Sequence, residues 1–128
     1  MKNTAYISGS IFGFLAVALG AFGAHGLEDL LTANGRIDTW ETAVHYQFVH
    51  IGLLLILGLL MERHPHKLLN VSAILTIVSI FIFSGSLYLL SLTNILWLGA
   101  ITPLGGLGFL GAWACLLFFF LQNRKSQQ

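Results

Sequence analysis

The residues best suited to chemistry are three histidines in or beside apolar segments. His25 follows a long apolar run, His45 begins a second run, and His50 lies deeper in that run. An ionisable side chain inside a membrane helix marks a functional site by default. Tyr46 and Gln47 lie within one helical turn of His50, so we expect the three side chains to share a face.

Two further polar steps are predicted at a similar level. Ser84 and Ser86 lie in the third apolar segment, and Thr102 precedes Pro103 in the fourth. Pro103 removes a backbone donor and leaves a carbonyl free at membrane depth. A helical rise of about 1.5 Å per residue places these residues in the outer half of the membrane. They predict a polar pocket lined by His25, Tyr46, Gln47, His50, Ser84, Ser86, Tyr88, Thr102 and Pro103.

A packed core is the competing interpretation, in which His50 hydrogen-bonds Ser84, Ser86, Tyr88 or the carbonyl freed by Pro103. No metal site is expected, because His45 and His50 are five residues apart and therefore do not lie on the same face of a helix. No cofactor or catalytic activity is expected either. The apolar runs hold no Asp or Glu to act as an acid or base, and no serine lies in a nucleophile motif.

The composition requires a membrane environment. The 128 residues are 56% hydrophobic and 9% charged, whereas soluble domains carry about 25% charged residues. A net charge of +1 gives no footprint for nucleic acid. Since a span needs about 20 apolar residues, the uncharged runs 3–27, 42–61 and 68–123 predict an all-α, polytopic bundle of four transmembrane helices in a single domain, 1–128. The helices are expected near residues 5–27, 40–61, 68–91 and 97–122, with an amphipathic outer linker at 28–39.

The distribution of charge predicts the orientation. In a four-span chain one side carries Lys2, Arg63, Lys67, Arg124 and Lys125. The other side carries Arg36 beside Glu28, Asp29, Asp38 and Glu41. Because Lys and Arg favour cytoplasmic loops, both chain ends are predicted to be cytoplasmic. Trp40 and Trp97 would then mark the outer membrane boundary, where aromatic rings gather.

Small residues form seams on the first and last helices. One seam consists of Gly9, Gly13, Ala16, Gly20 and Gly23, and the other of Gly105, Gly108, Ala112 and Cys115. Close backbone approach drives helix association in lipid. The first helix is therefore predicted to be central and to contact the fourth. A seam could instead join subunits, which would give a homo-oligomer.

Four motifs resemble those of a family of small membrane proteins without assigned function, domain of unknown function 423, also called uncharacterised protein family 0382. They are GAFGAHGL at 20–27, WETA at 40–43 with Tyr46 and His50, FSGSLY at 83–88, and ITPLGG at 101–106 followed by GAW at 111–113. The resemblance implies a four-helix protein of the bacterial cytoplasmic membrane, with no known reaction, substrate or cofactor.

These observations predict a multi-pass protein in contact with the lipid bilayer. We expect its outer pocket to bind or pass a small solute, a proton or a lipid headgroup. One chain of 14.0 kDa makes a poor pore, so transport would need an oligomer. The alternative is a scaffold or assembly protein that binds other membrane proteins through its helix faces, with the polar cluster purely structural.

Overall fold

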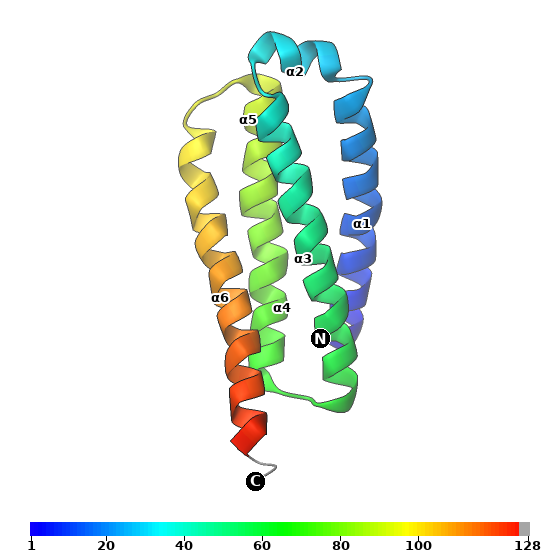
Figure 1. Cartoon of the computed structure of the whole chain (residues 1–128), viewed down its shortest axis with the longest axis vertical. Coiled ribbons are helices and arrows are strands. Elements are labelled where there is room, and N and C mark those ends of the chain that lie inside the picture. Colours follow the sequence, from blue (N-terminus) through cyan, green and yellow to red (C-terminus); the bar gives the residue numbers. More distant parts are fainter. Residues whose placement is uncertain (126–128) are drawn as a thin grey trace.

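The computed structural model describes residues 1–125 as long helices that run along a common axis (Figure 1). α1 (Lys2–Ala24) is followed by the short helix α2 (Glu28–Asn34), which lies across one end, and by α3 (Ile37–Arg63). α1 and α3 are separate spans because the polar segment 28–41, which contains five charged residues, interrupts the apolar sequence.

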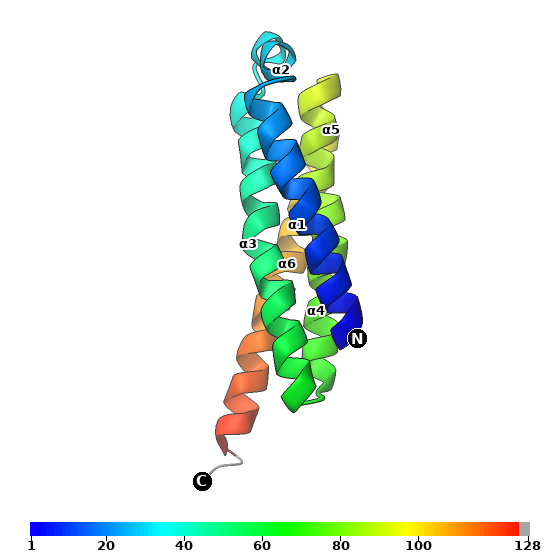
Figure 2. The same cartoon turned by 90° about the vertical axis from the view of Figure 1, so that its right-hand side faces the viewer.

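The third and fourth spans complete the bundle. α4 (Lys67–Ser79), a π-helical segment η1 (Ile80–Ser84) and α5 (Gly85–Thr93) form one continuous span, and α6 (Leu98–Lys125) forms the last. Four helices in the described part of the chain are long and apolar enough to cross a membrane. This confirms the predicted all-α, multi-pass fold, and every span ends within three residues of its predicted limits. Figure 2 shows the C-terminal end of α6 extending past the other helices.

Packing within the bundle differs from the prediction. α3 and the third span lie in the middle, α1 packs along α3, and α6 packs along α4, η1 and α5 (Figure 1). The predicted central position of the first helix, and its contact with the fourth, are therefore wrong. The two helices with glycine seams lie at opposite edges of the bundle, and each packs its seam against a neighbour nearer the centre.

The seam on α1 receives side chains from α3. A Cβ on Gly9 would lie 3.0 Å from Leu55 Cδ2, and one on Gly20 would lie 3.5 Å from Val44 Cγ1. Gly13 lies near Ile51, with a wider gap of 3.9 Å.

The indole of Trp40 packs against Gly23, where any Cβ would collide with it. Its Nε1 donates to the Leu19 carbonyl oxygen at 2.9 Å. Trp40 lies in the first turn of α3, at the end of the span, and is 2% exposed, so its ring packs inside the bundle and does not face lipid. By contrast, Trp97 is 64% exposed.

The seam on α6 packs against the third span. A Cβ on Gly105 would lie 2.5 Å from the backbone nitrogen of Phe83, which is part of η1. One on Gly108 would collide with the Ser79 hydroxyl. Both seams are thus filled inside the chain, so they give no support to subunit contacts through these glycines.

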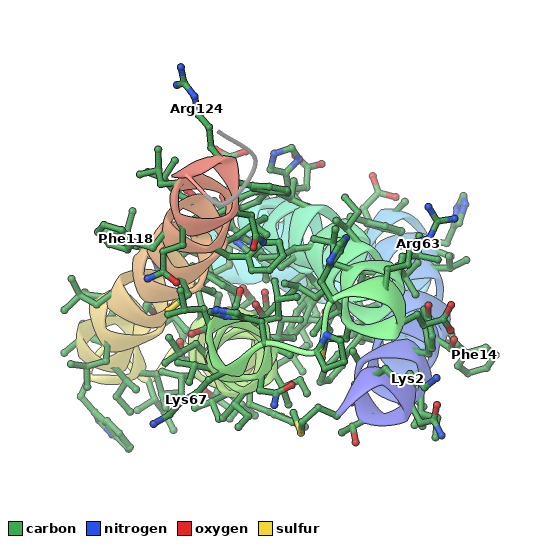
Figure 3. The ribbon with its side chains drawn as sticks, turned by 90° about the horizontal axis from the view of Figure 1, so that it is seen from below. Lys2, Phe14, Arg63, Lys67, Phe118 and Arg124 are labelled. Carbon is green, nitrogen blue, oxygen red and sulfur yellow. The ribbon has the colours of Figure 1, made fainter. Side chains whose placement is uncertain are left out.

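Basic residues gather at the end of the bundle opposite α2. Figure 3 labels Lys2, Arg63, Lys67 and Arg124 there, at the starts of α1 and α4 and the ends of α3 and α6. Phe14 is 77% exposed and points away from the bundle, as a lipid-facing side chain should. The cytoplasmic location of this end stays a prediction.

The replacement Gly105→Ala tests the close contact between α6 and η1. Overpacking a core costs about 1–3 kcal/mol, and the added methyl group would press on the backbone of Phe83. Gly52→Ala is the matched control, because no atom lies within 4 Å of its Cβ position and alanine favours helix. Unfolding in mixed micelles should show destabilisation by Gly105→Ala alone. Equal stabilities of the two variants would contradict the packing.

Candidate functional site

Gln47 lies at the centre of the buried polar contacts. Its Nε2 donates to the Phe12 carbonyl oxygen of α1 at 2.8 Å, and its Oε1 accepts from the Tyr88 hydroxyl of α5 at 2.8 Å. The side chain is 2% exposed. One amide thus joins three helices and has both its oxygen and its nitrogen engaged within the protein.

His50 makes a separate set of contacts toward α6. Its Nδ1 lies 2.7 Å from the Tyr46 carbonyl oxygen, and its Nε2 accepts from Trp113 Nε1 at 3.2 Å. An accepting Nε2 places the hydrogen of a neutral imidazole on Nδ1. The ring stacks on Phe109, with centroids 3.5 Å apart. Both ring nitrogens are therefore engaged in a packed aromatic setting.

These partners differ from both interpretations of the sequence, because none of the bonds predicted for His50 forms. The depth differs as well. α3 begins at Ile37, so His50 lies about 20 Å along the helix, near its midpoint. The sequence placed it closer to the outer end because the predicted helix began three residues later.

Three of the buried serines bridge neighbouring helices. Ser84 donates to the Ala43 carbonyl oxygen at 2.8 Å, and Ser86 lies 2.7 Å from the Thr102 hydroxyl. Ser72 donates to the Ala112 carbonyl oxygen at 2.8 Å. Within residues 1–125, every buried side-chain nitrogen and oxygen that the structure describes has a hydrogen-bond partner. The polar core is therefore complete without a ligand.

The residues of the predicted pocket do not surround one cavity. His25 and Pro103 are exposed, and Tyr46 is 39% exposed. Gln47 contacts α1 and α5, whereas His50 contacts α6. Tyr46 and His50, which are four residues apart, do share a face, and their rings stack with centroids 6.1 Å apart. Gln47 alone departs from the predicted face. The serines, Thr102 and Tyr88 belong to the satisfied core.

A cavity of about 860 Å³ lies instead at the α2 end of the bundle, against α1 and the first turns of α3. We call it the α1–α3 groove. α1 supplies small residues, α2 supplies one acidic and one apolar residue, and α3 supplies most of the wall. The lining comprises Gly20, Gly23, Ala24, Glu28, Leu31, Ile37, Asp38, Trp40, Glu41, Thr42, Val44, His45, Tyr46 and Phe48.

The wall of the groove changes from polar to apolar with depth. Asp38, Glu41 and His45 follow one another at spacings of three and four, which keeps them on one face of α3. Phe48 continues this stripe toward the bilayer centre. Among the described residues, no three His, Cys, Asp or Glu side chains are placed to hold a metal ion.

In the sequence, these acidic residues indicated only the orientation of the chain. The spacing of Asp38, Glu41 and His45 could have predicted the groove, because it places the three side chains on one helix face. Of the predicted pocket residues, the groove contains Tyr46 alone.

Comparisons with known proteins agree with the fold. Residues 19–106 match the family model described as protein of unknown function (DUF423). The UPF0382 membrane protein YwdK of Bacillus subtilis is 42% identical over 112 residues, which cover 87% of this chain and 90% of that protein. The UPF0382 inner membrane protein YgdD of Escherichia coli (strain K12) is 37% identical over 111 residues, which cover 87% of this chain and 84% of that protein. No solved structure matches.

A double-mutant cycle tests the three-helix junction at Gln47. Gln47→Leu should destabilise the bundle, since it leaves the Tyr88 hydroxyl without its acceptor. Tyr88→Phe should destabilise it less, and the pair should show a coupling of about 0.5–2 kcal/mol. Unfolding in mixed micelles measures all three variants. Strictly additive effects would mean that the two side chains do not interact.

Proposed function

The chain belongs to the DUF423 family of membrane proteins of unknown function, and we propose that it binds a membrane amphiphile by its headgroup in the α1–α3 groove. It is a multi-pass protein of the bacterial cytoplasmic membrane. The groove lies where two spans leave the bilayer, which is where lipid headgroups are found.

The cavity itself carries the proposal. Gly20 lies four residues before the end of α1, and Val44 lies seven residues into α3. At about 1.5 Å per residue, the groove extends roughly 6 Å inward along α1. Along α3 it reaches roughly 10 Å at Val44 and roughly 16 Å at Phe48. An amphiphile with its head at the polar rim would place the start of its chains beside Val44 and Phe48.

The charge of the rim favours a headgroup that contains an ammonium group. Glu28, Asp38 and Glu41 line the groove, and His45 is the one basic side chain among its lining residues. Arg36 does not neutralise them, because its Nε donates to Asn94 Oδ1 at 2.9 Å, toward the turn before α6. Phosphatidylethanolamine is a bilayer lipid with the required primary ammonium group.

The interior supports binding over passage. Both ring nitrogens of His50 have hydrogen-bond partners, and the Gln47 amide connects α3 to α1 and α5. A proton or solute crossing the bundle would have to break these contacts at the membrane centre, where unsatisfied polar groups cost several kcal/mol each.

Neutralising the rim tests the proposal. The full chain is reconstituted in nanodiscs of phosphatidylethanolamine and phosphatidylcholine, and the lipid retained by each chain is identified by native mass spectrometry. The triple variant Glu28→Gln, Asp38→Asn, Glu41→Gln should retain about five- to tenfold less phosphatidylethanolamine, since an exposed ion pair contributes about 0.2–1 kcal/mol.

Two further variants separate the groove from general charge effects. Glu62→Gln removes a carboxylate at the opposite end of α3 and should leave retention unchanged. Thr42 is exposed and lines the groove, so Thr42→Trp should fill the groove with a larger side chain without altering charge, and should lower retention. Equal retention by all variants would rule out this groove as the binding site.

A further inference from the structure

A second cavity, of about 430 Å³, lies at the end of the bundle opposite α2. It is open to the surface and bordered by the first residues of α1, by Met61 near the end of α3, and by the loop and first turn that lead into α4. We call it the basic cavity. Pockets of about 300–1,000 Å³ hold drug-sized ligands, so this cavity has room for a phosphate and an attached glycerol.

The side chains around the basic cavity suit an anion. Lys2, His66, Lys67 and Asn70 line it, and its lining includes no carboxylate. The nearest acidic residue in the sequence is Glu62, which does not line this cavity. The local charge is therefore positive, and the amide of Asn70 adds a hydrogen-bond donor.

Helix geometry adds to this positive charge. α1 begins at Lys2 and α4 begins at Lys67, so two long helices start at the same cavity. Neither has an acidic residue in its first turn, and Met1 provides no side-chain cap. The start of a helix carries partial positive charge and exposed N–H groups, which attract phosphate. His66 caps only one of these groups, because its Nδ1 accepts from the Leu68 nitrogen at 3.2 Å.

The basic cavity is separate from the two arginines at the same end of the bundle. Figure 3 shows Lys2 and Lys67 on one side of the bundle, with Arg63 and Arg124 toward the other. Neither arginine lines the cavity. Both lysines are the first residues of membrane-spanning helices, which places them at the level of lipid phosphates.

We propose that the basic cavity binds the phosphate of an anionic phospholipid. Basic pockets between membrane helices recognise anionic headgroups through the same combination of lysines and shape. This site is independent of the α1–α3 groove, which has the opposite charge and lies at the other end of the bundle.

The matched pairs of basic residues provide the test. The full chain is reconstituted in nanodiscs of phosphatidylcholine with a minor fraction of phosphatidylglycerol, and the retained lipid is counted by native mass spectrometry. Lys2→Gln with Lys67→Gln should retain about thirtyfold less phosphatidylglycerol, given the contribution of each lysine near a membrane surface. Arg63→Gln with Arg124→Gln removes the same charge and should retain the wild-type amount.

Inorganic phosphate, titrated into the detergent-purified wild-type chain, distinguishes the possible sources of the ligand. Failure to displace phosphatidylglycerol assigns the cavity to the lipid. Displacement at millimolar concentration, lost in the lysine variant, supports the phosphate chemistry and extends it to the free ion. Equal losses of phosphatidylglycerol in the lysine and arginine pairs, or no loss in either pair, would overturn the proposal.

Discussion

The hydrogen bonds of Gln47 connect α1, α3 and α5, whereas the glycine seam of α1 joins α1 to α3 alone. Lipid offers no partner to a buried amide, so its donors and acceptor must be satisfied by protein. Gln47 meets this requirement by bonding the Phe12 carbonyl oxygen on one side and the Tyr88 hydroxyl on the other. Because α1 lies at the edge of the bundle, this contact also fixes its rotation and depth against α3.

The same constraint governs the other polar residues of the core. Ser72, Ser84 and Trp40 each donate to a backbone carbonyl oxygen of a neighbouring helix. Such bonds act as interhelical connections and leave no side chain available for a ligand. The two cavities lie at the ends of the bundle instead, one lined by carboxylates and the other by lysines. Binding at either end therefore leaves the polar core intact.

The sequence predicted the spans well because charge and hydropathy are local properties. The unbroken apolar runs located every transmembrane helix, and the polar linker contained the short helix α2. The partners of each helix could not be predicted in this way. Gly9 and Gly105 each signal close packing, but which neighbour fills the space depends on the three-dimensional arrangement.

The direction of the polar side chains was equally hidden. Gln47 and His50 are neighbours in sequence, yet a rotation of about 60° around the helix axis sends them to different helices. The sequence placed Trp40 at the end of a span, and the contact with Gly23 shows that its ring faces α1 inside the bundle. The groove was not predicted because Asp38 and Glu41 stand in a charged linker and His45 in an apolar run, although the three share one face of α3.

The satisfied hydrogen bonds of the polar core imply that it is closed to water, and exchange of the Gln47 side-chain amide tests this most directly. Hydrogen–deuterium exchange of the Gln47 side-chain amide can be followed by NMR of the isotopically labelled chain in lipid bilayers. A closed core predicts strong protection of this amide, comparable to that of backbone amides at the centre of α3. Exchange as fast as that of an exposed amide such as Gln122 would contradict the account, because it would place water at the junction of the three helices.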